Sequence, residues 1–502
     1  MIKQTAIMAT VLASLSLCLT LTAAAKDVPP QLPRPDNSKA PDTTKPIKVF
    51  VLAGQSNMLE MGVIEGRSGG VHQDFYPNAK PVDGEKKKFV NFSVYKGAYS
   101  SEADYDRIKP ELTGNIEIGD PRLRRVKRRR YKIPMAPFPD LSQKAGYTTV
   151  LRGYVSIARA GKYEFRPGAN DSAYNVTTVD GKEVYRLDPG QTEPKLTFVE
   201  LQPGKRYALR TVYFKKPGHP FRIHLTNMPG ALSTIAVEDP SYAFLTDANG
   251  GWVTRDDVFF HDVHPLTRGK DAKPLCLQIP TKPGGRGIGV ELAFGHVMGT
   301  VFDEPVLLIR SACGNRGLWS GFRSPSRGGW EKDDAGKYKW TGSEYRNITV
   351  GVADTLKDIA KLLPGYKGQG CEIAGFVWFQ GHKDTGAEAP AKEYEENLVA
   401  LIKDIRKDLG KPKLPVMIAT VGFGGQEMAG NTLVVHKAQM AVGDPKKHPE
   451  FAGTVRTIDT RAFWRGVEVS PGGQGYHYNR NAETYMMVGD ALARGMAELL
   501  KK

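Results

Sequence analysis

A serine that follows a short apolar segment is the first group in this chain that could act as a nucleophile. Residues 49–53 (Val-Phe-Val-Leu-Ala) favour a buried strand, and Gly54 marks a sharp turn before Ser56. Open α/β sheets place their ligands at the carboxyl edge of the strands. Ser56 would project there, with its own amide and that of Asn57 facing a developing oxyanion. The alternative interpretation is a turn with a capping serine.

A serine hydroxyl needs a base, and His477 is the histidine best placed to supply one. It lies in the loop Ser-Pro-Gly-Gly-Gln-Gly-Tyr-His at residues 470–477, ahead of a predicted helix at 481–500. A loop histidine at the lip of a sheet can approach a nucleophile, whereas one on a helix face usually cannot. The alternative is a surface histidine without a catalytic role.

Two further strand ends carry groups that could bind an oxyanion. Gly375–Phe379 predicts a strand, and Gln380 would leave it as an amide donor. The turn at residues 312–317 (Ala-Cys-Gly-Asn-Arg-Gly) offers the backbone amides of Gly314 and Asn315. Each turn alone predicts no more than a loop. Three such strand ends at one edge of a sheet together indicate a catalytic site.

The elements that must position these groups alternate between strand and helix from residue 288 onward. Strands are predicted at 306–311, 373–379, 414–420 and 451–458, and helices at 349–363, 392–409 and 481–500. This alternation is typical of an α/β fold with a mostly parallel sheet covered on both faces. Because the first strand lies near residue 50, this domain is predicted to be discontinuous, over 47–62 and 240–502.

The intervening chain has a different character. Between about residues 90 and 228, short alternating segments separated by Pro-Gly and Asp-Gly turns predict an all-β sandwich. We place the inserted sandwich at 146–239 and assign 63–145 as a basic connecting segment. Residues 26–46 are rich in proline and predict a linker.

The first 25 residues predict a signal peptide, because Lys3 precedes an apolar run that ends at Ala23-Ala24-Ala25. We therefore expect export, to the periplasm or beyond the cell, with no stable membrane insertion. Only Cys276, Cys313 and Cys371 follow this segment, so at most one disulfide can form and its pairing stays open.

The composition is that of a globular protein, with 40% hydrophobic and 25% charged residues among 502. The formal net charge is +16, and residues 122–132 form a dense basic run. Nucleic acid is not an expected partner, because no recognition motif accompanies the run. A solvated loop or strand edge is the first interpretation, and attraction to an acidic polysaccharide or an anionic envelope surface is the second.

The tracts Ala53-Gly-Gln-Ser-Asn-Met58, Trp378-Phe-Gln-Gly381 with Asp384, and His477-Tyr-Asn-Arg-Asn-Ala-Glu-Thr-Tyr485 resemble sialate O-acetylesterase-like members of the SGNH hydrolase superfamily. These are close to carbohydrate esterase family 6, which includes acetylxylan esterases. The resemblance implies a flavodoxin-like three-layer α/β/α fold. It also implies a serine esterase without cofactor or metal, which deacetylates a carbohydrate.

Carried over to this sequence, the resemblance makes Ser56 the nucleophile and His477 the general base. It assigns the oxyanion hole to the Ser56 amide, an amide near Gly314 and the side chain of Gln380. Substrate contacts are expected from residues beside these groups, namely Gln55, Asn57, Arg316 and Trp319.

The sequence departs from the family pattern at the acid that should orient His477. His382 stands where many relatives have Glu after Gln-Gly, and Gln474 stands where many have Asp. Asp384 is the first candidate for the missing acid, with Asp459 behind it, and a backbone carbonyl is the remaining alternative.

The inserted segment resembles the protective-antigen type of β-sandwich through tracts such as Ala160-Gly-Lys-Tyr-Glu-Phe165 and Val179-Asp-Gly-Lys182. Such modules either bind glycans or only pack, and both roles stay open. The whole chain predicts an exported esterase for an acetylated polysaccharide or a sialic acid-type sugar. The rivals are a non-catalytic glycan-binding protein and an esterase for lipid or aryl esters.

Overall fold

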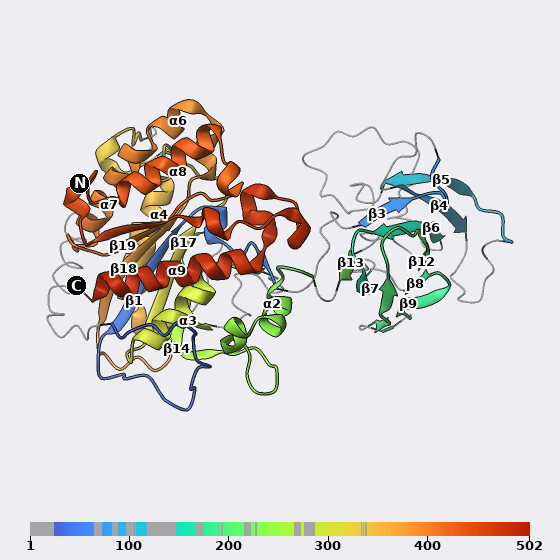
Figure 1. Ribbon diagram of the computed structural model, residues 1–502, viewed down its shortest axis with the longest axis horizontal. Coiled ribbons are helices and arrows are strands. Elements are labelled where there is room, and N and C mark those ends of the chain that lie inside the picture. Colours follow the sequence, from blue (N-terminus) through green and yellow to red (C-terminus); the bar gives the residue numbers. More distant parts are fainter. Residues whose placement is uncertain are drawn as a thin grey trace. The chain divides into compact units, whose positions relative to one another are not determined.

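The computed structural model in Figure 1 divides into two compact units. The first unit comprises the residues up to 64, 230–470 and those from 474 on, and the second comprises 65–229 with 471–473. The structure describes residues 25–501 apart from 65–72, 83–88, 97–104, 106, 118–146, 167–173, 189, 192–193, 215–221, 226–227, 266–272, 276–286, 333, 335 and 337–338. The basic run 122–132, Cys276 and all but the last residue of the predicted signal peptide lie outside these ranges.

A seven-stranded sheet forms the centre of the first unit, in the order β15-β14-β17-β1-β18-β19-β20. Six strands pair in parallel, and only the edge strand β15 is antiparallel. The strands are β1 (Ile47–Gly54), β14 (Arg255–Asp262), β15 (Lys273–Leu275), β17 (Val306–Ala312), β18 (Cys371–Phe379), β19 (Val416–Ala419) and β20 (Val455–Ile458). A separate short pair joins β2 (Gly62–Val63) to β16 (Gly287–Ile288).

Strand β1 lies between β17 and β18, and this position determines where a site can form. Five neighbouring strands have the order β17-β1-β18-β19-β20. If these five are renumbered 1 to 5 along the chain, the order in the sheet is 2-1-3-4-5. In such sheets the connections leave in opposite directions from the first strand, and a crevice opens beyond its carboxyl end. Ser56 lies two residues beyond that end of β1.

Helices pack against both faces of this sheet, and in Figure 1 α6 to α8 and the pair α3 and α9 lie on opposite sides of its strands. Along β1, Phe50 and Leu52 join the core that includes α3 and α9, whereas Val49 and Val51 join the core that includes α4, α7 and α8. The helices are α2 (Leu232–Glu238), α3 (Glu291–Val301), α4 (Ser343–Lys357), α5 (Ile359–Leu362), α6 (Glu388–Lys392), α7 (Tyr394–Asp408), α8 (Gly430–Val442) and α9 (Ala482–Leu500). Both faces of β1 are apolar for this reason.

The prediction of an α/β unit with a mostly parallel sheet is confirmed. The predicted strands at 306–311 and 373–379 correspond to β17 and β18, and the predicted helix at 349–363 corresponds to α4 and α5. Strand β14 and helix α8 were not predicted, because neither shows a clear apolar period in the sequence.

The second unit is built from antiparallel strands. Its larger sheet has the order β10-β9-β8-β12-β6-β4-β5, with β3 also pairing β6, and its smaller sheet has the order β11-β7-β13. The strands are β3 (Gln73–Tyr76), β4 (Phe89–Lys96), β5 (Leu112–Glu117), β6 (Tyr147–Ile157), β7 (Gly161–Arg166), β8 (Tyr174–Val179), β9 (Lys182–Leu187), β10 (Lys195–Leu196), β11 (Val199–Leu201), β12 (Tyr207–Phe214) and β13 (Arg222–Leu225). Strands β3 to β5 lie within residues 63–145, where the sequence analysis placed only a connecting segment.

Residues 26–46 contain no helix or strand, but they pack against the remainder of the first unit. Leu32 is buried in its core, Asn37 donates to the carbonyl of Thr254, and Arg494 donates to the carbonyl of Pro29. The segment predicted as a linker is thus anchored along its length. Among the described residues, no helix is both long and apolar enough to cross a membrane.

Gly54 provides a test of how closely β1 and β18 must approach at the site. A Cβ at this position would collide with the carbonyl group of Phe379. We therefore expect Gly54→Ala to lower the free energy of unfolding by about 1–3 kcal/mol, measured by urea denaturation. Gly386→Ala is the control, because nothing lies within 4 Å of its added Cβ. Equal stability of the two variants would contradict the close approach.

Candidate active site

Ser56 and His477 form a hydrogen-bonded pair at the carboxyl edge of the sheet. Ser56 begins the short 3₁₀ helix η1 (Ser56–Met58), and His477 lies in η10 (Gly475–Arg480). The Nε2 atom of His477 lies 2.9 Å from the Oγ atom of Ser56, although 421 residues separate them in the chain. This is the distance at which an imidazole can take a hydroxyl proton.

The other ring nitrogen of His477 faces an amide rather than a carboxylate. Its Nδ1 atom lies 3.3 Å from Oε1 of Gln474, and the same oxygen accepts a 3.0 Å bond from Nε of Arg480. An acceptor at Nδ1 favours the tautomer that leaves Nε2 unprotonated toward Ser56. Gln474 therefore orients His477 but adds no negative charge.

Asp384, predicted as the orienting acid, does not contact His477. It is buried, and its two oxygens accept bonds from the backbone amides of Leu318 and Trp319, at 2.9 Å each, and from the side chain of Gln380 at 2.7 Å. The carboxylate thus holds the loop after β17 against the end of β18. Asp459 bonds Arg461 and lies 3.1 Å from His436, so it is also engaged elsewhere.

Gln380 has its amide hydrogens committed to the protein. Its Nε2 atom donates to the carbonyl of Arg316 at 2.9 Å and to Asp384, and lies 3.1 Å from Oε1 of Gln55. Its Oε1 atom accepts from the hydroxyl of Tyr394. Because an amide group has only two hydrogens, Gln380 cannot supply the oxyanion donor predicted for it without breaking this network.

Backbone amides are better placed for an oxyanion. A Cβ built on Gly314 would lie 3.8 Å from the Cβ of Ser56, so the turn after β17 passes directly beside this serine. The Gly314 amide has no acceptor within the described part of the chain. The Ser56 amide begins a helix and lacks an intrahelical partner. Asn315 follows with φ +60 and is exposed, so it shapes this turn.

Gln55 and Asn57, predicted to contact substrate, instead tie loops together. Both are buried. Oε1 of Gln55 accepts from the amide of Lys383 at 3.0 Å, in the loop after β18. Asn57 donates to the carbonyl of Tyr476 and accepts from the hydroxyl of Tyr485, so it fixes the His477 loop next to Ser56.

Arg316 and Trp319 lie in the loop after β17. Arg316 pairs with Glu344 at 2.9 Å, while the side chain of Trp319 is 46% exposed. The indole ring is therefore available to a ligand, and its backbone amide is held by Asp384. Of the four predicted substrate-contacting residues, Trp319 presents the most open side chain.

An aromatic stack beside His477 was not anticipated from the sequence. The rings of His382 and Tyr476 stack with centroids 4.7 Å apart and 8° between their planes, and Phe423 meets His382 edge-on. Tyr476 is 42% exposed. The sequence did contain one indication of this stack, because His382 stands where many relatives have Glu. The sequence analysis interpreted that replacement only as the loss of an acid.

The loop that carries His477 has an unusual backbone. Tyr478, Asn479 and Arg480 all have positive φ values of 48°, 52° and 59°. Such strain persists only where the surroundings hold it. Here the hydroxyl of Tyr478 accepts from the Gly422 amide at 2.8 Å, and Asn479 donates to the carbonyl of Arg465.

The electrostatic surroundings keep His477 neutral. Burial, with the nearby charge of Arg480 and the neighbouring His382, lowers its pKa to about 4. At neutral pH the imidazole is therefore unprotonated, which is the state required to accept the proton of Ser56.

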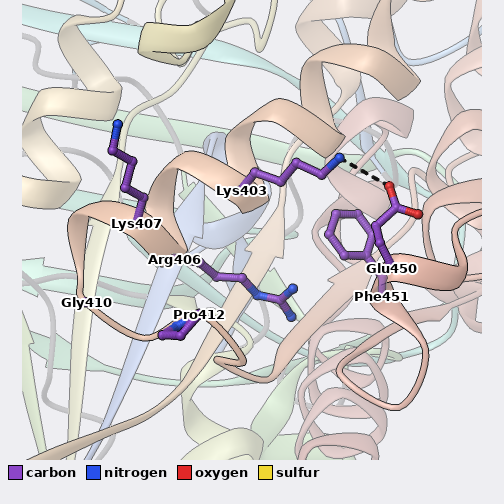
Figure 2. A pocket seen from close by; sticks show the side chains of 7 residues that line it. All are labelled: Lys403, Arg406, Lys407, Gly410, Pro412, Glu450 and Phe451. Carbon is purple, nitrogen blue, oxygen red and sulfur yellow. Dashed lines mark ion pairs between the residues drawn. The ribbon is translucent and has the colours of Figure 1, made fainter.

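A separate surface pocket lies at the opposite edge of the sheet. Figure 2 shows that it is lined by α7 side chains together with Gly410, Pro412, Glu450 and Phe451. Arg406, one of these α7 residues, bonds the carbonyl of Leu414, just ahead of β19, whereas Ser56 follows the carboxyl end of β1. None of the predicted site residues lines this pocket.

Replacing Gln474 by Glu tests the contact at Nδ1. A carboxylate there would favour the imidazolium, so we expect Gln474→Glu to raise the pKa of His477 by about one unit or more. The pKa is measured by NMR titration of protein labelled at the histidine rings. Gln474→Ala adds no charge and should leave the pKa low. An unchanged pKa in the Glu variant would contradict the observed contact.

Part of the chain is similar to known proteins. Residues 261–497 match the model of a family described as "Carbohydrate esterase, sialic acid-specific acetylesterase". A probable carbohydrate esterase of Arabidopsis thaliana is 38% identical over 56 residues, which cover 11% of this chain and 22% of that protein. The chain thus aligns with about a fifth of this curated relative.

Two solved structures align with parts of this chain. One is a protein from Arabidopsis thaliana, 17% identical, with a TM-score of 0.34, covering 49% of this chain and 87% of the other. The second is a carbohydrate acetylesterase from Xanthomonas citri, 15% identical, with a TM-score of 0.31, covering 69% of each chain. The family match over residues 261–497 includes strands β17 to β20 and the loop that carries His477.

Proposed function

We propose that this protein is a serine esterase that removes O-acetyl groups from a carbohydrate. The observation that carries the proposal is the 2.9 Å contact between Oγ of Ser56 and Nε2 of His477. The family match over residues 261–497 includes the His477 loop and supports the same class of substrate. In this reading the first unit is an SGNH-type three-layer domain.

The reaction follows from the geometry of the pair. Ser56 attacks the acetyl carbonyl while His477 takes its proton, and the amides of Ser56 and Gly314 stabilise the oxyanion. His477 then protonates the departing sugar hydroxyl, which leaves an acetyl group on Ser56. Water attacks this acetyl-enzyme with His477 again as the base, and acetate is released.

Gln474 takes the position of the missing acid. In serine hydrolases the acid holds the imidazole in its tautomer and stabilises the imidazolium, and an amide in this position can do only the first. The remaining stabilisation must come from the oxyanion donors, one of which is typically worth about 10²–10³ in kcat. We therefore propose a dyad oriented by an amide, with Asp384 as a support for the loops.

An acidic sugar fits the charges at this edge. Arg480 donates to the neutral Gln474 and forms no ion pair with a carboxylate among the described residues. Lys383 is exposed in the loop after β18. Since the charge of Arg480 lies near His477 and that of Lys383 near His382, a carboxylate on the substrate would be attracted to them. The exposed ring of Trp319 offers a face for a sugar to stack on.

The remaining expectations from the sequence belong to this proposal. Residues 1–25 would direct export to the periplasm or the exterior, and the second unit would be a β-sandwich that binds glycan or supports the enzyme. A non-catalytic glycan-binding protein is the rival. The loss of the acid at Gln474 favours that rival, but the intact Ser56–His477 contact favours the enzyme.

Acetate release from acetylated polysaccharides tests the function. We expect the wild-type protein to release acetate from at least one neutral or acidic polymer in a panel. Ser56→Ala should lower the rate by about 10³-fold or more, because the nucleophile is lost. Ser38→Ala, in an exposed turn, is the matched control and should retain the rate. Binding of the panel without acetate release would support the non-catalytic rival instead.

A further inference from the structure

Three side chains with metal-binding chemistry meet behind the turn that carries Gly314. They are His264, Cys313 and Glu344, and their ligand atoms all lie within 4.8 Å of one another. Each side chain is buried, with exposed fractions of 3%, 7% and 4% respectively. The proposed esterase reaction assigns no step to any of these three side chains.

The fold itself brings these residues together. His264 follows β14 and Cys313 follows β17, and these strands are parallel neighbours in which Asp262 lies opposite Arg310. Both residues therefore leave the sheet at the same edge. Glu344 lies in the first turn of α4, which packs over the end of β17. Three separate elements thus contribute one ligand atom each.

We propose that His264, Cys313 and Glu344 bind a single zinc-type divalent ion. Imidazole, thiolate and carboxylate are the three side-chain ligands that zinc takes in proteins, and a thiolate disfavours magnesium or calcium. The Nε2 atom of His264 and Oε2 of Glu344 already lie 2.9 Å apart, so both can turn toward one ion. A water molecule would complete a four-coordinate site.

The surroundings of Glu344 suit a ligating carboxylate. Its Oε1 atom accepts from Nε of Arg316 at 2.9 Å, and Asn347 donates to Oε2 at 3.0 Å. Outer partners of this kind orient metal ligands and are part of most metal sites. Zinc takes a thiolate and a neutral imidazole as ligands, so its binding releases the thiol proton of Cys313 and any second proton on the ring of His264.

Metal binding would affect the turn after β17, which carries the Gly314 amide. Cys313 directly precedes Gly314, and its amide donates to the carbonyl of Gly54 at 3.2 Å. An ion that fixes the Cys313 side chain would hold this turn at a constant distance from Ser56. The proposed ion has no contact with the substrate and acts through the position of the Gly314 amide.

Metal binding is tested on the untagged full chain, stripped with a chelator and equilibrated with Zn²⁺ alone. We expect about one zinc per chain after dialysis, and a rise in Tm of about 3 °C or more with saturating Zn²⁺. Titration with Cd²⁺ should produce the ultraviolet absorption of a thiolate–cadmium bond. Surface histidines can retain zinc but cannot produce that absorption.

The matched variants identify the ligand. Cys313→Ser should lose the cadmium absorption and the Tm shift, while Cys371→Ser, at the start of β18, should retain both. His264→Asn is the second ligand variant and should weaken zinc retention at least tenfold, with circular dichroism confirming that each variant is folded. Wild-type protein that retains no zinc, or a cadmium absorption that persists in Cys313→Ser, would overturn the proposal.

Discussion

The contact between Ser56 and His477 is the interaction on which the remainder of the site depends. It joins the first strand of the sheet to a loop at the far end of the chain, 421 residues away. The pair can form only if β1 lies in the middle of the sheet and the His477 loop folds back over its carboxyl end. Asn57 enforces this by bonding both Tyr476 and Tyr485. The strained backbone of residues 478–480 is held in the same place by the buried Tyr478.

A second constraint is the buried amide network beneath the pair. Gln55 and Gln380 bond each other across the ends of β1 and β18, and Asp384 joins them to the loop after β17. Buried polar groups of this kind are costly unless every partner is present, and then they specify one arrangement. The side chains that the sequence suggested for direct chemistry, Gln380 and Asp384, thus act on the geometry of the loops. In the proposed reaction, the groups left for the chemistry are Ser56, His477 and backbone amides.

The main elements could be predicted from the sequence because they depend on local patterns, such as the apolar runs before turns that indicated β1 and β18. The roles of Ser56 and His477 were assigned through the family resemblance, and the structure places the two side chains in contact. The partners of Asp384 were not predictable, since they depend on how the loop at Leu318 folds against β18. Gln474 was treated as a lost acid, because sequence spacing does not show that an amide oxygen can occupy the same position. The grouping of His264 with Cys313 was missed because strand β14 carries no clear period.

The most direct test of the account is a search for the acetyl group on Ser56. The protein is mixed with an activated acetate ester as substrate, the reaction is quenched rapidly, and the protein is analysed by mass spectrometry. One added acetyl group should be found, located on the peptide that contains Ser56. The same experiment on Ser56→Ala should show none. Acetate release without any covalent acetyl group on Ser56, or with the group on another residue, would contradict the nucleophilic role proposed for this serine.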